Sequence, residues 1–280
     1  MKFGINTFIW SLEFGPEQVA LLPSIREAGF HGIEVACFDP ERFASQLIRE
    51  ATAGEGLQST TVTVVPRGMS LLDDDAGIRA TTIDYFRRLI DAVAASGSRT
   101  FAGPFYSPVG YLPGRRRTEA EWNHAIESYR VLAPHAAAQG VVLAIEPLNR
   151  FETYFLNTAA DARRLAEEVN HPGLGILFDT FHANIEEKDI AAGYRTVSPW
   201  LRHVHTCEND RGTPGSGHVE WAAVFNALRD VGYDGWLTIE SFGFALPELS
   251  AAAAIWRDIE PTPDRIAFDG IRFLQQHFPG

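Results

Sequence analysis

Short apolar runs rich in β-branched and aromatic residues alternate along the chain with longer segments of helical periodicity. This alternation is typical of βα units, in which helices connect parallel strands. It predicts strands at Lys2–Ile9, Gly32–Ala36, Leu57–Val65, Arg99–Gly103, Val141–Glu146, Gly175–Asp179, Arg202–Thr206 and Gly235–Glu240. It predicts helices at Pro16–Ala28, 41–53, Ala76–Ala95, Thr118–Gln139, Thr158–Val169, Val219–Val231 and Asp264–His277.

Eight consecutive βα units in one chain predict a single closed (β/α)8 TIM barrel. No linker rich in Pro, Gly or Ser interrupts the units, so we expect residues 1–280 to form one domain. The alternative is an open, doubly wound sheet. However, the first strand is not followed by the GxGxxG turn of dinucleotide-binding folds.

Composition and charge exclude several classes of protein. The chain has 24 Lys and Arg against 36 Asp and Glu, a net charge of −12. Such a surface repels the phosphates of nucleic acids and anionic membranes, so we expect neither as a partner. The two cysteines, Cys37 and Cys207, form no CxxC motif, which fits a reducing cytoplasm. No signal peptide or membrane-spanning run is recognisable, so we expect a soluble cytoplasmic protein.

Each of the last four predicted strands ends in a residue that can bind a metal ion. These residues are Glu146, Asp179, His205 and Glu240. One such residue alone is more often a helix cap, a salt-bridge partner or a core histidine. Four on successive strands converge at the carboxyl-terminal rim of a barrel and together predict a metal site. Three carboxylates and one imidazole suit Mn²⁺, Mg²⁺ or Co²⁺ better than a structural zinc ion.

Three further polar residues follow these strand ends in the connecting loops: Glu152, His182 and Arg211. Loops on a rigid scaffold commonly carry the contacts to a substrate. The three side chains offer an acceptor, a switchable donor and a permanent donor, which suits a polyhydroxylated or carbonyl ligand. Ordinary solvated loop charge is the alternative interpretation.

Four segments around these positions resemble the signature segments of the ketose 3-epimerases. This group contains the D-tagatose, D-allulose (psicose) and L-ribulose 3-epimerases and lies within the xylose-isomerase-like barrel superfamily. The segments are Ile145–Glu152 with Leu156–Thr158, Phe178–Glu187, His205–Gly212 and Ile239–Phe242. They keep their order and spacing over residues 140–245. The first half of the chain resembles the group by strand order and by the opening Phe8-Ile9-Trp10.

The resemblance implies that the four strand-end residues bind a divalent metal, most often Mn²⁺ or Co²⁺. It implies that Glu146 and Glu240 are also the catalytic acid/base pair, and that the three loop residues hold the O1/O2 end of a ketose. A homodimer or homotetramer is implied as well, with residues 243–263 and Trp256 as a candidate interface. The third strand and the loop Pro104–Arg117 depart from the group's pattern, so the preferred sugar stays open.

Inversion of a carbon next to a carbonyl needs two acid/base groups, one on each face. The resemblance therefore predicts a metal-dependent epimerase that inverts C3 of a free ketose through a cis-enediolate, a reaction that Glu146 and Glu240 can perform. An aldose–ketose or inosose isomerase, which would use the same metal site at C1, is the nearest alternative. A lyase would need a further acid that the sequence does not identify, and the negative charge disfavours an apurinic-endonuclease-like nuclease. Retention of all four ligands disfavours a non-catalytic sugar-binding barrel.

Overall fold

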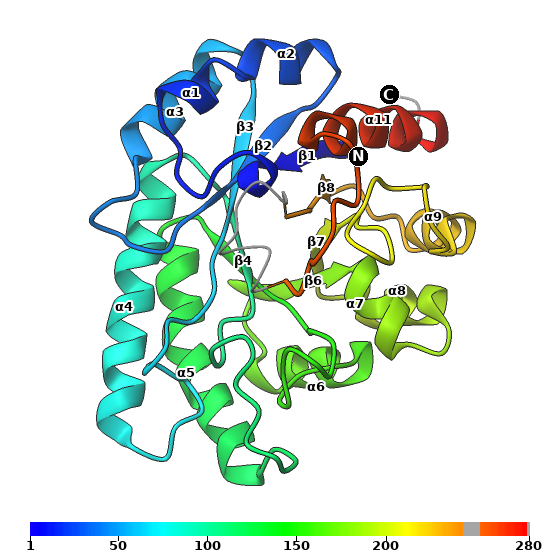
Figure 1. The fold of residues 1–280 in the computed structure, drawn as a ribbon. Coiled ribbons are helices and arrows are strands. Elements are labelled where there is room, and N and C mark those ends of the chain that lie inside the picture. The colour runs from blue at the N-terminus through cyan, green and yellow to red at the C-terminus, as the bar shows by residue number, and fades with distance from the viewer. Residues whose placement is uncertain (243–252, 279–280) are drawn as a thin grey trace.

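The strands of this protein close into a parallel barrel in the order β1 to β8, seen at the centre of Figure 1. The structure is a computed structural model and describes residues 1–242 and 253–278. The strands are β1 (Lys2–Asn6), β2 (Gly32–Ala36), β3 (Gln58–Val62), β4 (Thr100–Gly103), β5 (Val142–Ile145), β6 (Leu174–Asp179), β7 (Leu201–His205) and β8 (Trp236–Ile239). All neighbouring pairs are parallel, including β1 with β8, which confirms the predicted (β/α)8 barrel.

Helices surround the barrel on its outside (Figure 1). They are α1 (Pro16–Val19), α2 (Leu22–Glu27), α3 (Ser45–Gly54), α4 (Ala76–Ala95), α5 (Glu119–Ala138), α6 (Ala159–Val169), α7 (Thr180–Glu186), α8 (Ile190–Val197), α9 (Trp221–Asp230) and α11 (Pro263–His277). The sequence pattern did not predict α7 and α8. These helices have seven and eight residues, too few turns for a helical period to stand out.

Two boundaries near the amino terminus also differ from prediction. The first strand ends at Asn6 because the Asn6 side chain accepts a hydrogen bond of 2.8 Å from the Phe8 amide and starts the short 3₁₀ helix Thr7–Ile9. The predicted helix Pro16–Ala28 is divided into α1 and α2. Pro23 lies in the first turn of α2 and has no amide hydrogen, so it cannot continue the bonding of α1.

The interior of the barrel is divided between apolar and polar side chains. Bulky branched side chains normally fill such an interior. Here an apolar cluster holds small residues at several positions: Phe8, Ala36, Val62, Ala102, Ala144 and Leu177. A second buried group is polar and comes from β1, β2, β3 and β7: Asn6, Glu34, Thr60 and His203. We call these four residues the interior cluster.

The two ends of the chain meet at the junction of β1 and β8. The register pairs Lys2 with Trp236 and Ile5 with Ile239, and α11 packs against both strands. Figure 1 shows α11 beside the amino terminus. Within residues 1–242 and 253–278, no helix combines the length and apolar character needed to cross a membrane.

Candidate metal centre and active site

The four strand-end residues of the sequence prediction meet at one point of the barrel rim. Adjacent strands β5 to β8 bring together Glu146, Asp179, His205 and Glu240, which we call the rim cluster. One ligand atom from each lies within 4.8 Å of the others, and all four residues are buried. Carboxylates in such surroundings need a cation or hydrogen bonds to stay charged. The arrangement is that of a ligand set around one ion.

Two atoms of the rim cluster have unused bonding capacity. Among the described residues, neither Glu146 Oε1 nor His205 Nδ1 has a hydrogen-bond partner, although both are buried. His205 Nδ1 lies 3.4 Å from Glu240 Oε2 and 3.9 Å from Glu146 Oε1. Buried polar atoms are rarely left without a partner. These donor atoms therefore fit a divalent cation of the oxygen-preferring kind.

Asp179 has two roles that sequence alone treated as alternatives. Its Oδ1 caps helix α7 by accepting a hydrogen bond of 2.7 Å from the Phe181 amide. Its Oδ2 faces the rim cluster and accepts from Arg211 Nη1 at 2.7 Å. The cap fixes the rotamer of the side chain, so the second oxygen is held in place toward the other ligands.

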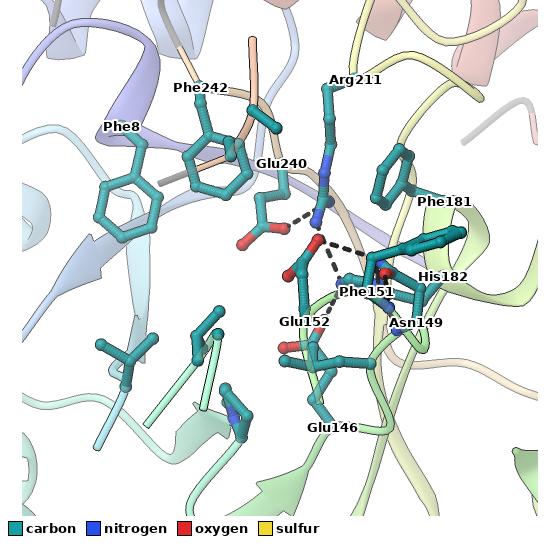
Figure 2. A pocket seen from close by; sticks show the side chains of 18 of the residues that line it. Phe8, Glu146, Asn149, Phe151, Glu152, Phe181, His182, Arg211, Glu240 and Phe242 are labelled. Carbon is teal, nitrogen blue, oxygen red and sulfur yellow. Dashed lines mark hydrogen bonds and ion pairs between the residues drawn. The ribbon is translucent and has the colours of Figure 1, made fainter. Parts of the chain in front are cut away.

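Arg211 is the buried cation of the site and bridges two members of the rim cluster. Its Nη1 donates to Asp179 Oδ2 and, at 2.8 Å, to Glu240 Oε2. Its guanidinium lies over the rings of Phe181 and Phe242, 4.0 and 5.0 Å from their centroids, as Figure 2 shows. Stacking on two rings orients the plane of the guanidinium and excludes water from its faces.

The backbone at Arg211 is held in an unfavourable conformation by its surroundings. Its φ of 67° lies in the left-handed region, which non-glycine residues rarely adopt. The Arg211 amide donates to the Glu208 carbonyl at 3.0 Å, and the Arg211 carbonyl accepts from the Ser241 hydroxyl. Glu208 is fully buried and its carboxylate accepts from four groups: Asn209 N, Gly215 N, Val219 N and Trp221 Nε1. Such strain typically marks functional positions.

His182 and Glu152 are joined to each other through Asn149. The Asn149 amide donates to His182 Nδ1 at 3.0 Å, and Asn149 Nδ2 donates to Glu152 Oε1 at 2.8 Å. A backbone amide can only donate, so His182 Nδ1 is the acceptor of this bond. His182 Nε2 lies 3.1 Å from Arg211 Nη2. Nε2 lies 3.6 Å from Glu146 Oε1. All three predicted loop residues, Glu152, His182 and Arg211, therefore lie together beside the rim cluster (Figure 2).

Burial and mutual repulsion shift the pKa values of these groups in different directions. Burial, followed by the charge of Glu240, raises the pKa of Glu146 well above its usual value. For Glu240 burial acts upward, but His205 and Arg211 outweigh it and the net pKa is lowered. Burial and then Arg211 lower the pKa of His182 well below its usual value, so this imidazole is neutral. Burial also raises the pKa of Glu152.

A cavity of about 1160 Å³ opens directly above the rim cluster. Its inner end is polar, with Glu146, Glu152, His182, Arg211 and Glu240. The remainder is mostly apolar and is lined by residues that include Phe8, Phe38, Val62, Val64, Pro66, Pro104, Phe151, Phe242 and Trp256. Figure 2 shows Phe8 and Phe242 beside the carboxylates. A polar reaction end within an apolar wall is typical of a small-molecule site.

Sequence reasoning missed several residues of this site. Asn149 and Glu208 were not selected, although both lie inside the recognised segments and each orients a residue that was. Glu34 was also missed, although a carboxylate in the middle of an apolar strand is a signal in itself. It is fully buried and its Oε1 lies 2.8 Å from His205 Nε2.

Comparison with known proteins agrees with this geometry. Residues 22–277 match the family model described as "Xylose isomerase-like TIM barrel". The chain is 37% identical over 278 residues to a probable ketose 3-epimerase of Synechocystis, covering 99% of this chain and 97% of that protein. It is 32% identical to a ketose 3-epimerase of Arthrobacter globiformis, covering 92% and 90% of the two chains.

Solved structures give the same grouping. A D-allulose 3-epimerase from Methylomonas, solved in complex with D-allulose, superposes with a TM-score of 0.92. The two chains are 28% identical, and the match covers 99% of this chain and 97% of the other. The resemblance inferred from the four sequence segments is thus confirmed. The chain belongs to the xylose isomerase-like TIM-barrel family and, within it, to the group of the ketose 3-epimerases.

Proposed function

We propose that this protein is a divalent-metal-dependent enzyme that inverts C3 of a free ketose of the D-tagatose, D-fructose, D-allulose or L-ribulose type. One observation carries the proposal: four ligand atoms from successive strands converge within 4.8 Å at the base of a cavity. The ketose 3-epimerases to which the chain is similar supply the reaction type.

The cation would be held by the rim cluster, Glu146, Asp179, His205 and Glu240. A divalent ion in this position polarises a carbonyl group as a Lewis acid. Mn²⁺ is the proposed physiological ion, with Co²⁺ or Mg²⁺ as alternatives, because oxygen ligands and one imidazole suit these ions. The unpartnered Glu146 Oε1 and His205 Nδ1 support this assignment.

Glu146 and Glu240 would move the proton at C3. They belong to the first and last of the four adjacent strands, so they can approach a bound sugar from different sides. One carboxylate removes the proton, which leaves a cis-enediolate, and the other returns a proton to the opposite face. The aromatic and aliphatic walls of the cavity reduce access of water to both groups.

Glu152, His182 and Arg211 would hold the O1/O2 end of the sugar. His182 turns its Nε2 toward the rim cluster, because its Nδ1 accepts from the Asn149 amide. Glu152 supplies a carboxylate acceptor, and Arg211 supplies a charged donor held between two rings. This combination matches alternating carbonyl and hydroxyl oxygens better than an apolar ligand.

Domain number, oligomeric state, location and partners of the protein are also proposed. Residues 1–280 would form one domain, since pairing of β1 with β8 makes barrel closure depend on both ends of the chain. A cytoplasmic homodimer or homotetramer is proposed, with no nucleic-acid or membrane partner, in keeping with the net charge of −12. Of the candidate interface at 243–263, residues 243–252 lie outside the described residues. Trp256, in the described part, is 79% exposed.

The test is an incubation of metal-stripped protein, reloaded with Mn²⁺, Co²⁺ or Mg²⁺, with a panel of free ketohexoses and ketopentoses in D₂O. We expect 3-epimers by chromatography, with deuterium at C3 by NMR. Deuterium at C1 with an aldose product would instead identify an aldose–ketose isomerase. If no ketose yields a 3-epimer with any of the three ions, the proposed function is wrong.

A further inference from the structure

Glu34 lies in the middle of β2 and is enclosed on every side by polar groups. Its side chain is fully buried. Oε1 accepts from Asn6 Nδ2 at 3.2 Å and contacts His205 Nε2 at 2.8 Å. Oε2 accepts from the Thr60 hydroxyl at 2.9 Å and lies 2.8 Å from His203 Nε2. Each oxygen thus has two polar neighbours, one on an adjacent strand and one across the barrel.

The contact with His205 determines which nitrogen of that imidazole carries the proton. A carboxylate oxygen accepts hydrogen bonds, so a neutral His205 in contact with Glu34 carries its hydrogen on Nε2. Nδ1 is then unprotonated and has a free lone pair. This is the atom that faces Glu240 Oε2 at 3.4 Å and has no hydrogen-bond partner among the described residues. The lone pair therefore points toward the other members of the rim cluster.

We propose that Glu34 is a positioning residue that fixes the Nε2–H tautomer and the ring orientation of His205, and thereby sets the affinity of the rim cluster for its divalent cation. The inference rests on the proposed function in one respect, namely that His205 is a metal ligand. Partners that orient metal-bound histidines in this way typically contribute about 10-fold to 100-fold in metal affinity. Asn6 and Thr60 act on Glu34 in turn, since they hold its two oxygens.

Glu34, His203 and His205 could in principle hold a second ion, since their ligand atoms also lie within 4.8 Å of one another. Two observations favour the positioning role. The contacts from Asn6 and Thr60 already occupy both carboxylate oxygens. Glu34 and His203 are fully buried, and neither lines the cavity through which the rim cluster is reached. A single ion per chain is therefore expected.

The main experiment measures Mn²⁺ and Co²⁺ binding by titration calorimetry for wild type, Glu34→Gln and Glu34→Asp. An amide has only one acceptor oxygen, so Glu34→Gln should weaken binding of either ion about 10-fold to 100-fold. Glu34→Asp keeps the carboxylate and should recover part of the loss. Thr61→Val is the matched control: its buried hydroxyl is in the neighbouring position of β3 but donates to Ser98 at 2.9 Å. It should bind both ions within threefold of wild type.

A second measurement reads the tautomer directly in the wild-type protein and does not depend on a variant that folds. Nitrogen NMR of ¹⁵N-histidine protein loaded with diamagnetic Mg²⁺ should show His205 protonated at Nε2, with the signal assigned through His205→Asn. A proton on Nδ1 would overturn the proposal. So would unchanged ion affinity in Glu34→Gln, or a stoichiometry of two ions per chain.

His205→Asn also separates this inference from the proposed function. If that variant binds Mn²⁺ as tightly as wild type, His205 is no ligand and the proposed metal site itself is wrong. If His205→Asn loses the ion but Glu34→Gln keeps it, the metal site stands and the role of Glu34 is refuted.

Discussion

Two groups of buried polar side chains occupy this barrel, and they differ in how well their glutamate oxygens are paired. In the interior cluster each oxygen of Glu34 has two polar neighbours. In the rim cluster Glu146 Oε1 and His205 Nδ1 have no hydrogen-bond partner among the described residues. The interior cluster is closed to the cavity, whereas Glu146 and Glu240 line it.

This difference indicates which buried carboxylates orient their neighbours and which can bind a cation. The same residue types occur in both groups, so composition does not distinguish them. A carboxylate whose acceptor sites are filled stays charged and holds its neighbours in place. A carboxylate with a free oxygen beside a cavity can bind a cation or take up a proton.

The largest effect is expected for the two carboxylates proposed to move the C3 proton. Glu146→Gln and Glu240→Gln remove both a metal ligand and an acid/base group, and the latter role alone is worth about 10²–10⁴ in rate. We expect turnover of the best ketose to become undetectable in each variant. Wild-type turnover in both would refute the assignment. The control is Glu121→Gln. Glu121 is a buried carboxylate of α5 that is paired with Arg115, and its replacement should leave activity unchanged.

Removal of the cation should destabilise the protein, because the buried Glu146 Oε1 and His205 Nδ1 have no other hydrogen-bond partner among the described residues. An ion present at 100 times its dissociation constant stabilises the folded state by about 2.7 kcal/mol. We expect chelation to lower the melting temperature and Mn²⁺ or Co²⁺ to restore it. In Asp179→Asn the ion should have little effect on melting. An equal shift in wild type and this variant would place the ion elsewhere.

Arg211→Lys tests whether the bridge between Asp179 and Glu240 depends on a planar cation. Lysine keeps the charge but loses the stacking on Phe181 and Phe242, and hydrogen bonds to charged groups are worth about 1.5–3 kcal/mol. We expect kcat/KM to fall about 10-fold to 100-fold, in line with this energy.

Arg117→Lys is a matched control for this substitution. Arg117 is likewise an arginine paired with a carboxylate beside an aromatic ring: it binds Asp161 with two nitrogens and lies 4.6 Å from the Trp122 ring centroid. It does not line the cavity, so its replacement should affect stability and leave kcat/KM near wild type. Equal kinetic losses in both variants would indicate a general effect of losing a stacked arginine.

The sequence predicted the rim cluster because its signal is local. Each ligand ends a short apolar run, and parallel strands bring such ends to one edge. The three loop residues could be selected for the same reason. The barrel followed from the repeat of strands and helices, whereas α7 and α8 were missed because each has about two turns.

Glu34 could not be assigned by the same reasoning because its partners are remote in sequence. It is separated from His205 by 171 positions, and the contact exists only because the barrel closes through β8 and β1 and brings β7 near β2 across the interior. Within Gly32–Ala36 it reads as one polar residue in a buried strand. The filling of its acceptor sites and the tautomer of His205 arise only in the folded barrel, so no spacing of residues along the sequence indicates them.

The smallest effect is expected for Glu121, a paired carboxylate outside the barrel interior. Burial alone would raise its pKa, but Arg115, the Thr118 amide and Tyr154 lower it from 4.5 to about 2. Because the folded-state pKa lies below the unfolded value, the stabilisation is complete above about pH 4.5 and is lost as the pH falls toward 2. Arg115 is 50% exposed, and solvent screening limits the contribution to about 1 kcal/mol. Urea unfolding of wild type and Glu121→Gln should therefore differ at pH 7 and converge as the pH approaches 2. A difference that stays constant with pH would mean that the charge of Glu121 contributes nothing and that only its shape stabilises the start of α5.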